Sequence, residues 1–336
     1  MNNSINNNTA TNNNSKNNGG MIMMNATIKT MDVFAQVVKD EVESRLGNGY
    51  LVSIHDVLKN NNTHLTGISI KTEESNVAPT IYLDSMFDRY VEGEVSVSDV
   101  VSQIISVYKS HAFTVPFDVS KITEYSVCKE KICYKLVNAM HNRDLLLDTP
   151  YRSVFGDLAV IYYIVVSDDK DGSATITIRN NMSEAWGVTE EELYETALEN
   201  TQRLYRGSVK NMAAVMQEIL FDHMDDENAK EFFDMAVSEE DMAPMYVCTN
   251  IRKINGAGVL LYDNLLKEFA EKKGSDFYIL PSSIHETLLV PVSDEMSVEY
   301  LRSLVYEVNR TQVAPEEVLS DNVYLYSRKD DKICIA

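Results

Sequence analysis

The chain has 336 residues, enough for one large domain or for two domains of ordinary size. With 44% apolar and 9% aromatic residues it can bury a core, which excludes wholesale disorder. Asp and Glu number 51 against 30 Lys and Arg. The resulting net charge of −21 argues against direct binding to nucleic acid and to anionic membrane surfaces, because like charges repel.

Cysteine usage and hydropathy predict a cytoplasmic protein. No apolar run is long enough for a membrane span, and the N-terminus begins with polar Asn repeats instead of a charged and then apolar signal sequence. The cysteines form neither a disulfide framework nor a zinc-binding spacing. We expect buried free thiols in a reducing compartment at all four: Cys128, Cys133, Cys248 and Cys334.

Residues 1–30 are predicted to form a disordered tail without an assigned function. Ten of the first 20 residues are Asn, and such a segment cannot bury enough apolar surface to offset the entropy lost on ordering. The rest of the chain is predicted to form an N-terminal α+β domain over residues 31–130 and a C-terminal α+β domain over residues 131–336.

In the N-terminal domain, apolar residues spaced by three and four predict helices, and β-branched runs between turn residues predict strands. The first helix is expected to end at Gly47. A later helix is expected to be capped by Ser96 or Ser98. In chain order the segments are a helix at 31–46, strands at 50–58 and 66–71 around a polar turn at 60–63, a short apolar run at 80–83, and the capped helix reaching Tyr108.

The middle of the chain contains the clearest strand signal. Residues 158–166 are almost wholly apolar, which predicts a central strand paired as a hairpin with residues 174–178. Thr189 and Glu192 have the spacing of a capping box at the start of a helix, and a further helical stretch is expected over 211–235.

After residue 245, strands and helices alternate. We expect strands at 245–249 and 257–262, a helix at 264–273, a hairpin over 277–291, a helix at 297–308, and strands at 323–326 and 333–335. The order favours an α+β fold in which helices pack on small, mainly antiparallel sheets.

Several pieces of the sequence carry a family resemblance. They are Asp157-Leu-Ala-Val-Ile-Tyr-Tyr163, Ala174-Thr-Ile-Thr-Ile-Arg-Asn180 with Trp186, Phe277 to Pro291, Asn309 to Asp321, and Val323-Tyr324. They resemble an uncharacterised bacterial family, domain-of-unknown-function family 5688, and together cover most of residues 31–335. The resemblance implies a cytoplasmic protein common in anaerobic Firmicutes, in genomes rich in mobile elements. It supplies no catalytic residue and no activity.

The turn inside the 277–291 hairpin holds the candidate catalytic residues Ser283, His285 and Glu286, together with Ser282. Hydrolysis by a serine needs its hydroxyl within hydrogen-bond reach of an imidazole that a third group orients. If residues 284–290 form a strand, Ser283 and His285 share a face about 6 to 7 Å apart, so His285 needs another partner. The alternative is a tight turn whose serines bond backbone amides while His285 bonds a neighbouring carbonyl.

Metal and cofactor motifs are absent from the sequence. None of the six histidines has the spacing of a zinc motif, and the segment around His223 lacks the alternating carboxylates and turn glycine of a calcium loop. Asn255-Gly-Ala-Gly258 lacks the Lys and Ser or Thr of a phosphate-binding loop, so we read it as a β-turn. We therefore expect no cofactor and no metal.

An acidic stretch is the other candidate site. Ten of the 24 residues from Glu218 to Asp241 are Asp or Glu, and only Lys230 is basic. Carboxylates spaced along a helix can imitate a row of phosphates and bind a basic protein. The alternative is a solvated acidic face that only keeps the protein soluble. The candidate partner-binding residues are Asp222, Asp225, Asp226, Glu227, Glu231 and Asp234.

These features predict a non-enzymatic cytoplasmic interaction protein that binds a basic or nucleic-acid-binding protein partner. One specific form is an inhibitor that mimics nucleic acid, for example against a host defence nuclease. The alternatives are a metal-independent hydrolase centred on Ser283 and His285, and a family member whose activity the sequence does not reveal.

Overall fold

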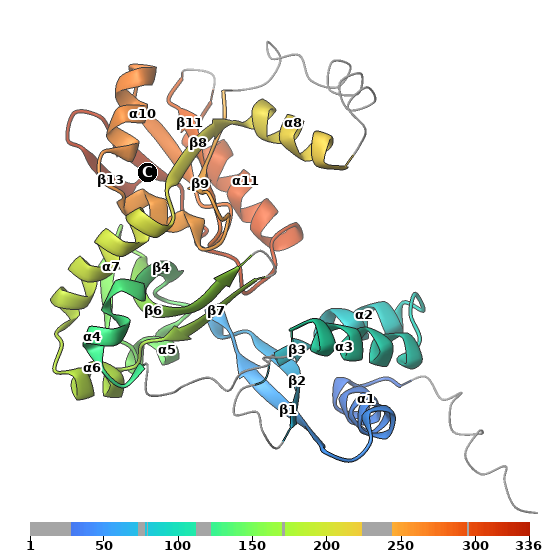
Figure 1. The fold of residues 1–336 in the computed structure, drawn as a ribbon. Coiled ribbons are helices and arrows are strands. Elements are labelled where there is room, and N and C mark those ends of the chain that lie inside the picture. The colour runs from blue at the N-terminus through green and yellow to red at the C-terminus, as the bar shows by residue number, and fades with distance from the viewer. Residues whose placement is uncertain are drawn as a thin grey trace, which may run out of the picture. The chain divides into compact units, whose positions relative to one another are not determined.

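The computed structural model describes residues 28–72, 78, 80–111, 122–169, 172–223, 244–293 and 296–336. The chain forms two compact units, shown in Figure 1: Met1–Val57 with Leu65–Phe117, and Leu58–His64 with Asp118–Ala336. The predicted boundary lies between residues 130 and 131, whereas the division between the units falls between Phe117 and Asp118. Both units combine helices with small sheets, which confirms the α+β class. Of the predicted tail, only residues 28–30 are among those described.

The first unit packs helices on a three-stranded sheet of order β1-β2-β3. Its elements are α1 (Met31–Leu46), β1 (Tyr50–Leu58), β2 (His64–Thr72), β3 (Thr80–Tyr82), α2 (Asp84–Val91) and α3 (Val97–His111). The apolar stripe of α1, including Phe34 and Val38, is fully buried against Ile68 of β2 and Ile104 of α3. The spacing of three and four in α1 is therefore the buried face of a helix, as predicted.

Ser96, and not Ser98, caps α3. Its Oγ accepts a hydrogen bond from the Asp99 backbone amide at 3.2 Å and donates to the Asp99 carboxylate at 2.6 Å. The hydrogen bonds that the Asp99 carboxylate accepts from the Ser96 hydroxyl and from the Ser96 backbone amide lower the pKa of Asp99 below its usual value. Ser98 instead bonds the guanidinium of Arg45 at the end of α1.

The second unit contains two sheets. In the four-stranded one, β6 (Leu158–Asp169) is central, as predicted, and pairs antiparallel with β4 (Ile132–Asn138), β5 (Tyr151–Val154) and β7 (Gly172–Thr177). Its helices are α4 (Tyr125–Cys128), the 3-10 turn η4 (Lys129–Lys131), α5 (Arg143–Leu147), α6 (Asn180–Trp186) and α7 (Glu190–Leu204). The capping box predicted at the start of α7 is present, with Thr189 and Glu192 bonding each other's backbone amides.

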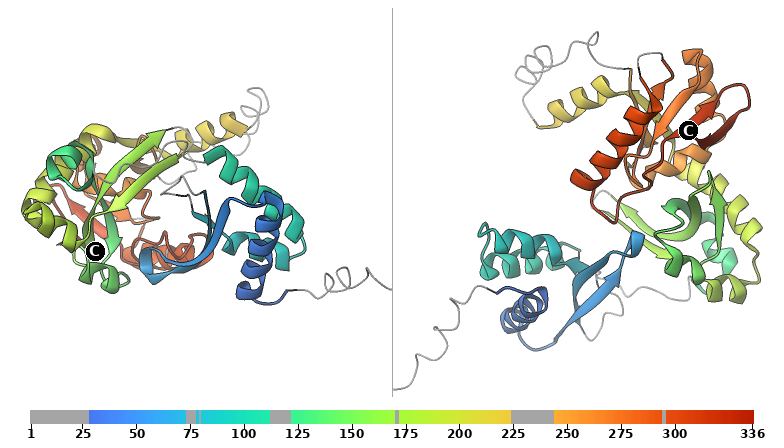
Figure 2. Two further views of the ribbon diagram at one scale, coloured as in Figure 1. Left: turned by 60° about the horizontal axis from the view of Figure 1, so that its bottom comes forward. Right: turned by 180° about the vertical axis from the view of Figure 1, so that it is seen from behind.

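The six-stranded sheet has the order β13-β12-β10-β11-β9-β8 and is antiparallel throughout. Its strands are β8 (Gly207–Asn211), β9 (Tyr246–Asn250), β10 (Phe277–Leu280), β11 (Thr287–Pro291), β12 (Tyr324–Ser327) and β13 (Lys332–Ile335). Successive residues of β10 face opposite sides. Phe277 packs with α10 (Leu265–Lys273), and Leu280 packs with α11 (Val298–Thr311), which crosses the sheet in Figure 2.

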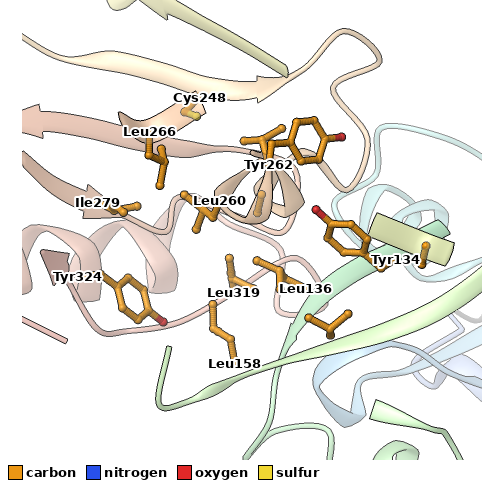
Figure 3. Packing of buried hydrophobic residues seen from close by; sticks show 14 of the residues in the cluster. Tyr134, Leu136, Leu158, Cys248, Leu260, Tyr262, Leu266, Ile279, Leu319 and Tyr324 are labelled. Carbon is orange, nitrogen blue, oxygen red and sulfur yellow. The ribbon is translucent and has the colours of Figure 1, made fainter. Parts of the chain in front are cut away.

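One hydrophobic core joins the two sheets of the second unit. Figure 3 shows Tyr134, Leu136 and Leu158 of the four-stranded sheet beside Leu260, Leu319 and Tyr324, which come from the part of the unit that contains the six-stranded sheet. Tyr134 is 1% exposed, and its hydroxyl donates to the Gly258 carbonyl at 2.8 Å, so the polar end of the ring keeps a partner inside the core. The second unit therefore behaves as a single packed body with a sheet on either side.

The predicted strand at 257–262 is wrong. These residues form most of the 3-10 segment η5 (Gly256–Leu261), which is buried over five consecutive positions and shows no alternation. A short, continuously apolar run does not distinguish a buried strand from a buried helical turn. Asn255 adopts a φ of 51°, and the Ala257 amide donates to the Ile284 carbonyl at 3.1 Å. These contacts bend the chain away from an extended path.

The turn between β1 and β2, the 3-10 turn η2 (Asn60–Asn62), belongs to the second unit. Asn61 and Asn62 have positive φ angles, which Asn tolerates better than most residues. The Asn61 amide donates to the carbonyls of Pro315 at 2.9 Å and Val318 at 2.6 Å. Asn142, which is fully buried, accepts from the Asn61 backbone and donates to its side chain. These bonds fix the turn within the unit.

Candidate functional site

Residues 281–286 connect β10 to β11 in a tight loop. The hairpin is antiparallel as predicted, with Leu280 opposite Leu288, but β11 begins at Thr287, so Ser283 and His285 do not share a strand face. Ser283 is 9% exposed, and its hydroxyl accepts the backbone amide of His285 at 3.0 Å. Its own amide donates to the Glu286 carbonyl at 3.1 Å. The serine hydroxyl therefore stabilises the turn.

The imidazole of His285 reaches two other segments. Its Nδ1 accepts the backbone amide of Asn255 at 3.2 Å, and its Nε2 lies 3.4 Å from Glu317 Oε1. In a neutral ring that accepts at Nδ1, the proton is on Nε2 and faces the carboxylate. A general base needs a free lone pair directed at the proton it removes. In this geometry His285 has none to offer the Ser283 hydroxyl.

The loop also forms backbone contacts that a side chain would disturb. Thr249 Oγ1 donates to the His285 carbonyl at 2.7 Å. A Cβ on Gly256 would collide with both groups of that hydrogen bond. The position requires glycine because η5 approaches the loop too closely for any larger residue. Asn255, Gly256 and His285 together form a packed junction between β9, η5 and β11.

The cysteine thiols of the core are unsuited to nucleophilic chemistry at neutral pH. Burial raises the pKa of Cys133 to about 11 and that of Cys248 to about 12, and it also raises the pKa of Cys128. A thiol must ionise before it can attack. Three of the four cysteines are buried and free as expected, whereas Cys334 on β13 is exposed.

Neither a metal site nor a membrane-spanning helix is found in the described ranges. There, no three His, Cys, Asp or Glu side chains gather closely enough to hold a metal ion. No helix in the same ranges combines the length and the apolar character that crossing a bilayer requires.

The acidic candidates fall mostly where the chain is not described. Asp225, Asp226, Glu227, Glu231 and Asp234 lie outside the described residues. The backbone of Asp222 belongs to α8 (Met212–His223), but its side chain is not among those described. The described part of the acidic stretch begins with Glu218, which pairs with Lys210 at 2.6 Å while both side chains remain 47% exposed.

Helix α8 presents apolar side chains to solvent, a feature that the sequence analysis did not identify. From Met212 to Phe221 only Ala213 is buried, while Met216 is 38% and Ile219 is 49% exposed. An amphipathic surface helix normally hides its apolar residues. The sequence did indicate this surface, because eight of these ten residues are apolar. A helix with apolar residues on all sides exposes some of them unless another segment or a partner packs on it.

Comparison with known proteins gives one match. No curated protein matches the chain, and no solved structure does. A family model described as "Family of unknown function (DUF5688)" matches residues 31–328. That range includes the β10–β11 loop, α8, most of the first unit and nearly all of the second. Because the match extends over most of its length, the chain belongs to this family of unknown function, DUF5688.

Proposed function

We propose that this is a non-enzymatic, cytoplasmic interaction protein that binds a basic protein partner through α8 and the acidic stretch that follows Glu218. The observation that carries the proposal is α8, a twelve-residue helix in which only Ala213 is buried over 212–221 and the large apolar side chains Met216 and Ile219 are exposed. Methionine and other large apolar side chains are enriched at the centres of protein interfaces. A helix of this kind fits an apolar groove, with Met216 and Ile219 as anchors.

Charge identifies the class of partner. Nine further Asp and Glu residues follow Glu218 before residue 242, and the whole chain carries a net charge of −21. A groove bordered by Lys and Arg would gain from this field, whereas an acidic partner would be repelled. Nucleic-acid-binding proteins have such basic surfaces. The specific form that we propose is a bacterial, mobile-element-borne inhibitor that occupies the basic surface of a DNA- or RNA-binding protein in place of nucleic acid.

The geometry of the β10–β11 loop favours this reading over hydrolysis. The Ser283 hydroxyl bonds the turn, and both nitrogens of His285 face other groups. The loop therefore has the hydrogen bonds of a structural junction, whereas α8 has the exposed apolar side chains Met216 and Ile219.

The test is a capture experiment with the full chain. Native lysate is passed over the protein at low salt and washed at high salt, since salt screens an electrostatic contact. We expect recovery of a protein with a basic, nucleic-acid-binding surface, and loss of that protein in the high-salt wash. Its affinity for purified variants is then measured by calorimetry. An empty capture at low salt would overturn the proposal.

Two variants and a control separate the contributions. The first variant replaces Met216 and Ile219 by Ser, and the second reverses charge at Asp225, Asp226 and Glu227. Each should weaken binding at least tenfold, because interface anchors and desolvated charges carry most of the affinity. The control makes the same change in net charge on other helices, at the exposed residues Glu184, Glu195 and Glu199. If the control weakens binding as much as the second variant, net charge and not this surface is responsible.

A further inference from the structure

The second unit contains a pocket of about 650 Å³ between three segments that are far apart in the sequence. It is formed by the η2 turn, the loop that follows β4, and the chain from the end of α11 to Asp321. The lining residues are Asn61, Asn62, Met140, His141, Asn309, Arg310, Val313, Pro315, Val318 and Asp321. Pockets that hold small organic ligands have volumes of roughly 300 to 1,000 Å³, so the size is suitable.

Buried amides hold the three walls in place. Asn142 is fully buried and bonds both Asn61 and the Asn138 carbonyl. The Asn138 side chain accepts the backbone amides of Met140 and His141, at 3.0 and 3.1 Å, and donates to the Leu319 carbonyl at 3.1 Å. When the walls of a site are already fixed, less binding free energy is lost to ordering side chains and loops as the ligand binds. The pocket is therefore formed in advance of any ligand.

The charges on the wall cancel. Arg310 forms two hydrogen bonds with the Asp321 carboxylate, at 3.3 and 3.2 Å, and its guanidinium lies 3.3 Å from the centroid of the Tyr306 ring. The bonds from Arg310 and Asn309 outweigh the burial of Asp321 and lower its pKa, so the pair stays ionised. Two further charges bond the lining, Arg143 at Met140 and Asp144 at Asn62, and they are also of opposite sign. An ion entering the pocket would therefore meet no net opposite charge, and an anion would also be repelled by the chain's net charge of −21.

The remaining lining groups combine apolar faces with hydrogen-bonding edges. Val313, Val318, Pro315 and Met140 supply the apolar surface, and thioethers pack well against aromatic rings. Asn62 and His141 are exposed at the rim. The Asn62 amide donates one hydrogen bond to the Asp144 carboxylate at 3.3 Å, and among the described residues neither ring nitrogen of His141 has a hydrogen-bond partner. Amide and imidazole groups match the donor and acceptor pattern on the edge of a nucleobase.

We propose that this pocket binds an uncharged heterocyclic ring compound of the nucleoside class. The ring would lie against Met140 and Pro315, and its polar edge would face Asn62 and His141. The absence of net charge on the wall favours a nucleoside over the corresponding nucleotide. A sugar alone would leave the apolar wall without a partner.

The proposal is tested by calorimetry on the full chain with adenosine, guanosine, cytidine and uridine, and with AMP and ribose as comparison probes. We expect at least one nucleoside to bind, AMP to bind more weakly than adenosine if adenosine is that ligand, and ribose not to bind. Failure of all four nucleosides to bind at about 1 mM would overturn the proposal, as would AMP binding more tightly than adenosine.

Variants locate the binding. Val313→Trp fills the pocket from a half-buried position and should weaken binding about tenfold or more. Leu147→Trp adds the same bulk at a side chain that is 80% exposed outside the pocket, and binding should be unchanged. His141→Ala is a second test at an exposed position that does not depend on accommodating a large side chain. Binding that survives both pocket variants would place the ligand elsewhere and refute the assignment.

Discussion

Replacing His285 by Ala distinguishes a structural imidazole from a catalytic one. The change removes the acceptor of the Asn255 amide at 3.2 Å and the 3.4 Å contact with Glu317. The hydrogen bond to Nδ1 contributes about 1 kcal/mol, and the longer, partly exposed contact between the neutral ring's Nε2–H and the Glu317 carboxylate contributes about 0.5 kcal/mol or less. The free energy of unfolding should therefore fall by about 1.5 kcal/mol. In a unit of this size that corresponds to a Tm lower by about 3 to 6 °C.

Urea unfolding followed by circular dichroism measures the difference. Glu317→Gln removes only the charge of the carboxylate that faces Nε2, so it should cost about 0.5 kcal/mol or less. His141→Ala is the matched control at an exposed histidine, and it should stay within about 0.5 kcal/mol of the parent. If His285→Ala also stays within that limit, the imidazole does not hold the junction together. The reasoning that assigns it a structural role would then be refuted.

Three further changes test the fold. Gly256→Ala should lower the free energy of unfolding by about 3 kcal/mol or more, because the new Cβ would overlap the Thr249 hydroxyl and the His285 carbonyl. Gly258→Ala should cost less, because its Cβ would lie 3.2 Å from the Tyr134 ring, a tight contact without overlap. Thermal unfolding of both variants gives the comparison. Thr189→Ala removes the capping box of α7 and should lower the free energy of unfolding, measured in urea, by about 1 kcal/mol. No change would mean that water satisfies the helix N-terminus as well as the Thr189 side chain does. The pKa of Asp321 is lower in the folded state than in the unfolded state. The ionised carboxylate therefore stabilises the fold above the unfolded-state pKa, and this stabilisation is lost as the pH falls through the folded-state pKa. Between pH 5 and pH 2, Asp321→Asn should therefore lose less stability than the parent, and parallel losses would contradict the assigned pKa.

Local signals predicted much of the fold. The apolar stripe of α1 and the capping box of α7 depend on residues three or four apart, and both appear at the predicted places. The β10–β11 hairpin also needs only neighbouring residues to specify it. By contrast, β8 has the sequence Gly-Ser-Val-Lys-Asn, which carries no alternation, and it is a strand because β9 pairs with it.

In the candidate site, too, local features could be predicted from the sequence and long-range contacts could not. The residue types of the loop could be read from the sequence. The partners of His285, however, are Asn255, 30 residues earlier, and Glu317, 32 residues later. No local pattern encodes such a meeting. The apolar composition of α8 could be read from the sequence, yet which of its side chains are exposed depends on how the described elements pack beside it.

The position of the η2 turn has a consequence for the order of folding. Asn61 bonds the Val318 carbonyl, 257 residues further along the chain. During synthesis the turn leaves the ribosome early, but its acceptors are made almost last. Contacts of such high sequence separation form slowly, because a long loop must close before they contribute. A fragment that begins at residue 118 would lack the turn altogether, leaving the fully buried Asn142 without two of its bonds. Attempts to express the second unit alone should therefore retain residues 58–64, through a circular permutation or a grafted loop.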